Sequence, residues 1–114
     1  MSEDLFLKII NRQIPADIVF ETDDVLAFRD INPQAPVHVL IIPKLHIRTI
    51  DDIQPEHAEL VGKLYLAAAE IAKAEGLTTT GYRVVMNCKD AGGQMVYHIH
   101  LHLLGGRQMS WPLG

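Results

Sequence analysis

Three histidines that alternate with apolar residues are the clearest pattern in the chain, and they lie in residues 98–104 (HIHLHLL). Successive side chains of an extended backbone point to opposite faces, so the pattern predicts a strand with His98, His100 and His102 on one face. The apolar residues between them would be buried on the other face. Since alternate residues lie about 6.6 to 7 Å apart, the three histidines span about 13 Å. One ion cannot contact all three, whereas an extended polar ligand can.

Other hydrophobic runs predict further strands. Residues 18–20 and 25–28 flank the acidic turn 21–24 and are expected to form a hairpin. The run 37–43 is strongly apolar, which predicts a strand buried on both faces, and the run 82–87 is expected to pair with the histidine strand. Two prolines exclude a helix from residues 30–36, and the polar, glycine-rich stretch 88–93 is expected to be a loop.

Two helices are predicted from apolar residues at three- and four-residue spacing. One is a short amphipathic helix over residues 3–12, with Ser2 available as the N-cap. The other is long, runs from 55 to 75, begins with Pro55 and ends before Gly76. The expected fold class is α+β, with a largely antiparallel sheet of about five strands, the long helix packed on it and a short N-terminal helix.

Composition narrows the class of protein. A chain of 114 residues that is 48% hydrophobic is expected to form one domain over residues 1–114. The formal net charge of −4 argues against sequence-independent binding to nucleic acid. A single cysteine leaves no internal disulfide, and the acidic start of the chain contains no long apolar run. We therefore expect a cytoplasmic protein that does not bind nucleic acid or span a membrane.

The histidine row has three possible roles: structure, metal binding or anion chemistry. Solvent exposure of one strand face does not by itself explain three imidazoles in strict alternation. Glycine pairs before and after the row leave backbone N–H groups free to approach a phosphate. A zinc site would need His98 and His100 plus another ligand, which His38 could supply, while Cys88 is a lone thiol. Anion chemistry is favoured and a metal site stays open.

His-x-His-x-His followed by two apolar residues resembles the signature of the histidine-triad superfamily of nucleotide hydrolases and transferases. The matching stretches are residues 6–15 (FLKIINRQIP), 26–36 (LAFRDINPQAP), 38–43, 92–106 and 106–112. They cover nearly the whole chain. Their sequence is similar to the branch of histidine triad nucleotide-binding proteins (HINT), which hydrolyse purine nucleoside phosphoramidates. The residue at the third triad position favours a hydrolase over a transferase, because His102 stands where the transferases usually carry glutamine.

The resemblance implies a mechanism without metal or cofactor. His100 would attack phosphorus and form a covalent nucleotidyl intermediate, with its second nitrogen donating to a backbone acceptor. His102, Gln94 and nearby amides would stabilise charge on the phosphate oxygens. His98 would polarise and orient the site, beside His38, which the resemblance also implies to be an active-site residue. His46 and His57 are expected to face solvent and to take no part in the chemistry.

The resemblance also implies ligand and subunit contacts. The residues expected to contact the purine nucleotide are Phe6, Ile9, Phe28, Asp30, Ile31, Asn87, Gly93, Gln94, His100 and His102. From the residues alone, a core role for Phe6 and Ile9 is as well supported as a ligand role, and a carboxylate at position 30 is more typical of a turn. The long helix would form a homodimer interface, although packing within one subunit explains its apolar stripe equally well.

Two further residues are implicated in handling the leaving group. Trp111 would reach the partner's active site across the homodimer. Met95 stands where vertebrate members carry a serine able to bond the departing group, so recognition of the leaving amine is open. The expected function is purine nucleoside phosphoramidate hydrolysis. The alternatives are hydrolysis of dinucleoside polyphosphates, a nucleotide-binding regulatory module with little catalysis, and a zinc-binding module.

Overall fold

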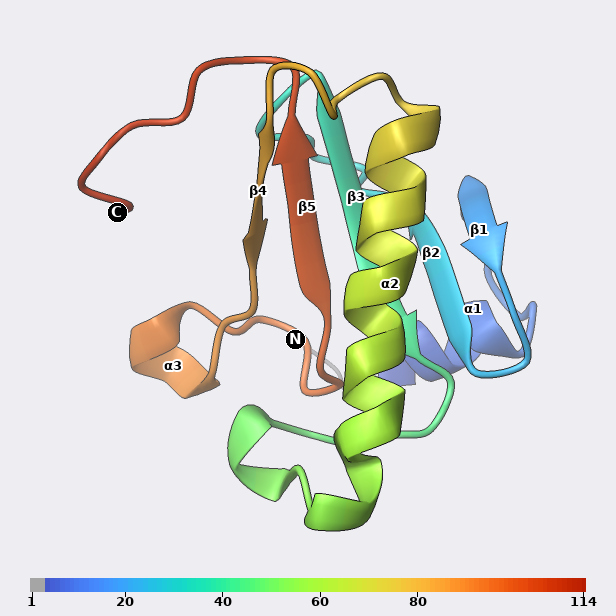
Figure 1. Cartoon of the computed structure of the whole chain (residues 1–114). Coiled ribbons are helices and arrows are strands. Elements are labelled where there is room, and N and C mark those ends of the chain that lie inside the picture. Colours follow the sequence, from blue (N-terminus) through green and yellow to red (C-terminus); the bar gives the residue numbers. More distant parts are fainter. Residues whose placement is uncertain (1–3) are drawn as a thin grey trace.

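Five antiparallel strands form one sheet in the order β1-β2-β3-β5-β4 in the computed structural model, which describes residues 4–114 (Figure 1). The strands are β1 (Ile18–Glu21), β2 (Val25–Arg29), β3 (Val37–Pro43), β4 (Tyr82–Val85) and β5 (Leu101–Gly105). The helices are α1 (Asp4–Ile10), α2 (Ala58–Ala74) and α3 (Lys89–Gly92), and two 3₁₀ turns, η1 (Ile50–Asp52) and η2 (Pro55–His57), precede α2. The predicted α+β class with an antiparallel sheet is confirmed. The proposed Ser2 cap lies outside the described residues.

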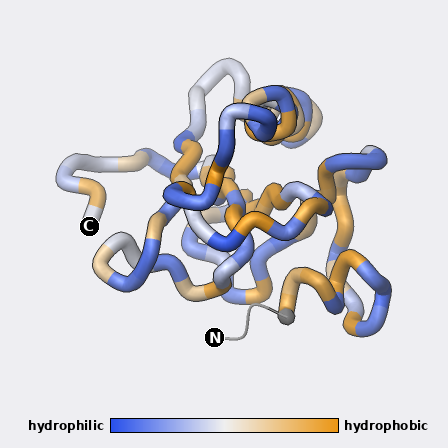
Figure 2. The backbone as a smooth tube through the Cα atoms, turned by 90° about the horizontal axis from the view of Figure 1, so that it is seen from below, coloured by the Kyte–Doolittle hydropathy of each residue, from blue (hydrophilic) through white to orange (hydrophobic). Residues whose placement is uncertain are grey.

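The sheet has a different layer on each face. Helix α2 packs on one face, where Leu64, Ala68 and Ile71 are buried against Leu101 and Leu103 of β5. Helix α1 covers the other face, where it contributes to a second apolar cluster with β2 and β3. Viewed from below, the two helices lie on opposite sides of the strands (Figure 2). The apolar side chains of β5 are therefore buried against α2, and its histidine, His102, lies on the face of the sheet that carries α1.

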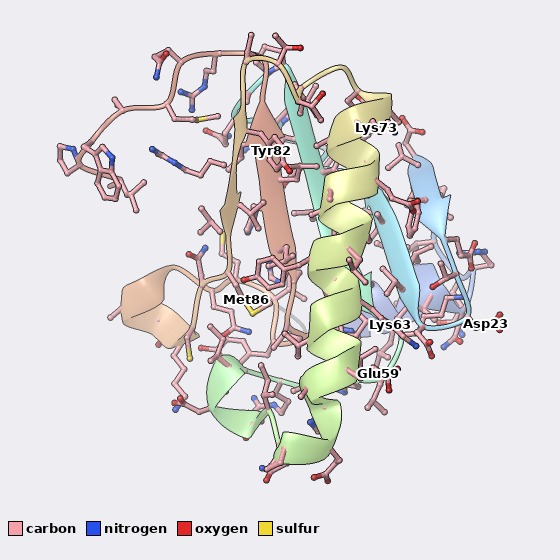
Figure 3. The ribbon with its side chains drawn as sticks, viewed as in Figure 1. Asp23, Glu59, Lys63, Lys73, Tyr82 and Met86 are labelled. Atoms are coloured by element: carbon pink, nitrogen blue, oxygen red, sulfur yellow. The ribbon has the colours of Figure 1, made fainter. Side chains whose placement is uncertain are left out.

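The long helix forms nearly as its periodicity predicts. Pro55 opens a 3₁₀ turn, the α-helix proper begins at Ala58, and Gly76 ends it with a φ of +75° that suits glycine. Its outer side carries charged side chains, including Glu59, Lys63 and Lys73 (Figure 3). Lys63 reaches the β1–β2 turn and pairs with Asp24 at 2.8 Å. No helix in the described part of the chain is long and apolar enough to cross a membrane.

Three predicted boundaries were wrong. The stretch 88–93, predicted as a loop, contains the short helix α3, which Gly93 closes at a φ of +85°. Strand β4 ends at Val85, opposite His102, so the predicted run to 87 is too long. The regular strand β5 begins only at Leu101, where its pairing with Ile41 of β3 starts. Before it, Ile99 donates its N–H to the carbonyl of Ile47 in the loop after β3.

Candidate active site

The pairing of β3 with β5 decides which histidines meet. Leu40 lies opposite His102, and His38 lies opposite Leu104. Since directly opposed and diagonal residues share one face of a sheet, His38 and His102 become neighbours, with ring centres 5.2 Å apart. His100 lies on the other side of His102, with ring centres 4.9 Å apart. His38, His102 and His100 therefore form a continuous row on the side of the sheet that carries α1.

The His100 ring is held in one tautomer. Its Nδ1 lies 2.8 Å from the carbonyl oxygen of His98, and because a carbonyl can only accept, Nδ1 carries the proton. The predicted bond to a backbone acceptor is confirmed. The edge-on ring of Phe6 packs against His100 with centres 5.0 Å apart. His100 is therefore a buried, oriented imidazole whose Nε2 has a free lone pair.

His98 lies deeper than the sequence suggested. It is wholly buried, and its Nε2 donates to the carbonyl of Pro43 at 2.7 Å. Its Nδ1 is a buried atom without a hydrogen-bond partner among the described residues. The prediction that His38 lies beside His98 was wrong, because the β3–β5 register places His38 against His102. His98 thus anchors the approach to β5 instead of forming a pair with His38.

His46 and His57 also differ from expectation. His46 is half-buried, stacks on His98 with ring centres 5.0 Å apart, and bonds through Nε2 to the carbonyl of Tyr97 at 2.9 Å. His57 is half-buried, and its Nδ1 accepts the N–H of Gln54 at 2.9 Å. Neither ring simply faces solvent. Sequence reasoning missed the support that His46 gives His98, since no local pattern links two residues more than fifty positions apart.

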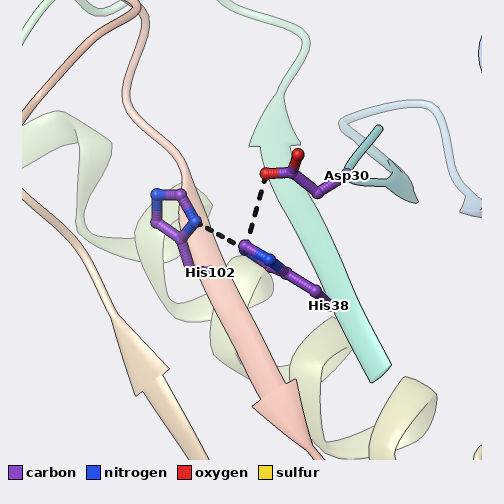
Figure 4. A group of neighbouring side chains, drawn as sticks. All are labelled: Asp30, His38 and His102. Atoms are coloured by element: carbon purple, nitrogen blue, oxygen red, sulfur yellow. Dashed lines mark hydrogen bonds and ion pairs between the residues drawn. The ribbon is translucent and has the colours of Figure 1, made fainter. Parts of the chain in front are cut away.

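A polar cluster forms where His38 meets Asp30 and His102 (Figure 4). The Nε2 of His38 lies 3.0 Å from Nδ1 of His102 and 3.5 Å from a carboxylate oxygen of Asp30. The Nδ1 of His38 accepts the backbone N–H of Gln34 at 3.0 Å. Asp30 also accepts the N–H of Asn32 at 2.8 Å, which forms a local turn. The cluster combines a carboxylate with two imidazoles whose hydrogen-bond directions are constrained by the backbone.

Gln94 is buried and bonded entirely to main-chain atoms. Its amide nitrogen donates to the carbonyls of Arg48 and Val96 at 2.7 and 3.1 Å, and its oxygen accepts the N–H of Lys89 at 2.8 Å. The side chain thereby joins α3 to the loop after β3. A phosphate contact from this amide stays a prediction, and it would compete with these bonds. The neighbouring Gly93 lies beside Asn87, whose side-chain nitrogen would be 3.9 Å from an added Cβ.

The apolar residues predicted to contact the purine base or sugar divide into a buried group and one exposed residue. Phe6, Ile9 and Phe28 are buried together, with the rings of Phe6 and Phe28 5.5 Å apart in an edge-on contact. Ile31 is fully exposed beside Asp30. The Phe6 ring also contacts the rings of His98 and His100, with centres 5.8 and 5.0 Å apart.

The two residues predicted for the leaving group are on the surface. Met95 is 67% exposed and Trp111 is 81% exposed. The guanidinium of Arg83 lies over the Trp111 ring, 5.7 Å from its centre. The C-terminal segment extends away from the sheet (Figure 1). A role at a partner's site stays a prediction.

Burial sets the charge state of the imidazoles. It lowers the pKa of His98 and of His102 to about 4, with neighbouring imidazoles adding to the effect. It also lowers the pKa of His38 and of His100, while the carboxylate of Asp30 opposes both shifts. The four rings are therefore neutral at pH 7.

We expect the protein to lose stability on mild acidification. The pKa of His98 falls from 6.5 to about 4 on folding, so between these values the unfolded chain binds more protons than the folded chain. The free energy of unfolding is highest above pH 6.5 and decreases as the pH falls toward 4. The shifted pKa of His98 alone accounts for roughly 3 kcal/mol of this decrease. Urea unfolding at several pH values between 7 and 5 would measure the slope, and His98→Asn should reduce it while leaving the contribution of His102, whose pKa is also lowered to about 4. Equal stability at both ends would contradict the assignment.

Comparison with known proteins places this geometry in a family. The HIT domain family model matches residues 11–109. The chain is 54% identical to the purine nucleoside phosphoramidase of Escherichia coli K12, covering 98% of this chain and 91% of that protein. It is 53% identical to the 14 kDa zinc-binding protein of Zea mays, covering 99% and 89%. It is 50% identical to the adenylylsulfatase HINT1 of Arabidopsis thaliana, covering 99% and 78%.

The fold agrees with these matches. The crystal structure of a HIT family hydrolase from Legionella pneumophila Philadelphia 1 superposes with a TM-score of 0.95 at 58% sequence identity, covering 96% of this chain and 98% of that one. This chain and that hydrolase therefore share one fold over nearly their whole lengths. The chain is a member of the HIT domain family.

Proposed function

We propose that the protein hydrolyses the phosphorus–nitrogen bond of purine nucleoside phosphoramidates through a nucleotidyl intermediate on His100. The observation that carries this proposal is the tautomer of His100, whose Nδ1 is committed to a carbonyl and whose Nε2 is bare. A neutral imidazole in this state can attack phosphorus without a separate base. The identity with a named phosphoramidase, and with hydrolases of the same family, supports the reaction class and the nucleotide substrate.

The reaction divides into two displacements at phosphorus. In the first, the lone pair of His100 Nε2 forms a bond to phosphorus while the bond to the amine nitrogen breaks, and that nitrogen takes up a proton as it leaves. In the second, water attacks phosphorus and loses a proton to solvent, the bond to Nε2 breaks, and the nucleoside monophosphate is released with the neutral ring returned to its starting state. His102 lies next to His100 and would stabilise the negative charge on the phosphoryl oxygens.

The remaining contacts are assigned by position. Asp30 would accept hydrogen bonds from the two ribose hydroxyls, which a carboxylate can do simultaneously. Ile31 would cover the base or sugar from its exposed position, and Phe6 would border the base where it packs on His100. Asn87 and Gly93, side by side after β4, would contact ribose or phosphate. No resident cofactor takes part.

We infer a symmetric homodimer as the working assembly, in the cytoplasm. Helix α2 and strand β4 expose large apolar side chains, Tyr65, Leu66 and Tyr82, which a second copy would cover. In such a dimer the C-terminal segment would be free to place Trp111 near the partner's histidine row. Together with Met95, it would then shape which amines fit.

Zinc binding is an alternative function that the hydrogen bonding of His38 argues against. Asp30, His38 and His102 offer one ligand atom each within 4.8 Å of one another. A zinc-bound histidine normally donates its second ring N–H to a neighbouring acceptor. In His38 that nitrogen instead accepts the N–H of Gln34, so Nε2 holds the only ring proton and has no lone pair for a metal. A resident zinc ion does not fit this cluster as it is folded.

Steady-state turnover would test the proposed function. Adenosine and guanosine phosphoramidates with varied amines would be compared with a diadenosine polyphosphate, and release of the nucleoside monophosphate would be followed. We expect phosphoramidates to be preferred, and a radiolabelled adenosine phosphoramidate quenched early to leave label on the protein. Preference for the polyphosphate would reassign the substrate. Tight binding of AMP without turnover of any phosphoramidate would overturn the proposal in favour of a regulatory nucleotide-binding module.

A further inference from the structure

We propose that the backbone N–H of Gln34 fixes the proton positions of two imidazoles in series, so that His38 is a positioning residue that holds His102 as a neutral N–H donor. The three groups form one hydrogen-bonded chain. Gln34 N lies 3.0 Å from His38 Nδ1, and His38 Nε2 lies 3.0 Å from His102 Nδ1. Both rings belong to neighbouring strands of one sheet, which keeps the chain in register.

The position of the ring proton on His38 is determined by the backbone. A main-chain N–H can only donate, so Nδ1 of His38 must present a lone pair. A neutral imidazole has one ring proton, which in His38 must then be on Nε2. His38 is buried, and charging it would require a proton on the nitrogen that faces the Gln34 N–H. The backbone contact therefore keeps this ring neutral and makes its Nε2 a donor.

The second ring follows from the first. The Nε2–H of His38 has two neighbours, Nδ1 of His102 at 3.0 Å and the Asp30 carboxylate at 3.5 Å, and the shorter contact is to His102. Donation in the reverse direction would leave His38 with no ring proton at all. Nδ1 of His102 is thus the acceptor, and its own proton is on Nε2. Figure 4 shows this second nitrogen turned away from His38.

The outcome is a pair of adjacent rings with opposite proton positions. His100 has its proton on Nδ1 and a bare Nε2, whereas His102, 4.9 Å away, has a bare Nδ1 and its proton on Nε2. A nucleophile and a hydrogen-bond donor therefore lie side by side. A second proton on His102 would set its Nδ1–H against the Nε2–H of His38, so His102 is disfavoured as an imidazolium.

The catalytic consequence rests on the proposed function. His102 stabilises charge on the phosphoryl oxygens as a fixed donor, and it does not supply the proton that the departing amine requires. That proton must come from water or from the substrate. The proton positions themselves depend only on the fold, so they can be tested without any substrate.

Two substitutions at His38 separate the two ends of its ring. His38→Asn keeps an acceptor near the position of Nδ1 but has no donor that reaches His102. His38→Gln extends an amide toward the position of Nε2 and can donate to His102. Two-bond ¹H–¹⁵N correlation spectra distinguish protonated from bare ring nitrogens, and they would be recorded for the wild type and for both variants.

We expect the wild type to show protons on Nε2 of His38 and of His102, and on Nδ1 of His100. His38→Asn should leave His102 exchanging between tautomers and lower kcat by about 10²-fold, comparable to the loss of one charge-stabilising donor, with little change in KM. His38→Gln should restore both the His102 tautomer and most of the rate.

A proton on Nδ1 of His102 in the wild type would overturn the proposal, and this spectrum requires no variant to fold. An unchanged His102 tautomer and kcat in His38→Asn would overturn it as well. If the wild type shows the expected protons but hydrolyses no phosphoramidate, the proposed function fails while the proton chain stands. If turnover occurs with different proton positions, the function stands and the proton chain fails.

Discussion

Replacing His100 with alanine is expected to abolish phosphoramidate turnover, lowering kcat by at least about 10⁴-fold, because it removes the only atom proposed to bond to phosphorus. The ring is buried but bonds to a single carbonyl, so the fold should survive its truncation better than the reaction does. Turnover of an adenosine phosphoramidate and covalent labelling by a radioactive substrate would both be measured. We expect neither to be detectable in His100→Ala.

Two controls make this result specific to the nucleophile. His57→Gln changes a half-buried ring at the start of α2 and should retain full activity. Calorimetric titration of His100→Ala with AMP should still show binding, which would separate loss of chemistry from loss of the site. Turnover in His100→Ala above the uncatalysed rate would eliminate His100 as the nucleophile, whatever the family likeness.

The second large effect is expected at Phe6. Its ring is buried and makes edge-on contacts with Phe28, His98 and His100 at centre distances of 5.5, 5.8 and 5.0 Å. Phe6→Ala should lower the free energy of unfolding by about 3–5 kcal/mol, since it empties a large volume beneath the histidine row. It should also reduce kcat, because His100 loses the surface that holds its ring in place. Urea unfolding and steady-state kinetics would measure the two effects.

Phe6→Leu is the matched control for that volume. It keeps the position apolar and should cost less than Phe6→Ala, about 1.5 kcal/mol, while removing the aromatic edge contacts. If kcat falls in Phe6→Leu as much as in Phe6→Ala, the ring contacts matter more than the volume. A Phe6→Ala variant as stable and as active as the wild type would show that α1 does not support the site in solution.

Sequence alone predicted the parts of the fold that depend on local periodicity. Alternation at 98–104 placed Ile99, Leu101 and Leu103 in the core, and all three are buried against α2. Three- and four-residue spacing located α2 to within a turn. These predictions succeeded because the face of a strand or helix that is buried is set by neighbouring residues along the chain. The same alternation also marked the residues that carry the chemistry.

The partners of the histidines could not be predicted from those patterns. His38 meets His102 because Val39 pairs with Leu103, and such a register depends on two segments sixty-four residues apart. His46 stacks on His98 through a loop whose path no periodicity specifies. The donor to His38 is a main-chain N–H, which the identity of Gln34 does not reveal. The sequence thus named the reactive rings but not what orients them.

The main-chain partners of the imidazoles have a consequence for how this sequence can diverge. Carbonyls of Pro43, Tyr97 and His98 and the amide of Gln34 position four rings, and a carbonyl is present whatever residue supplies it. Positions such as 34 and 97 can therefore exchange side chains while the protonation pattern is inherited unchanged, except that proline at 34 would remove the N–H. Substitutions at these two positions would change the side-chain contacts of Gln34 with Asn32 and of Tyr97 with Asp90, but not the main-chain groups that orient the rings.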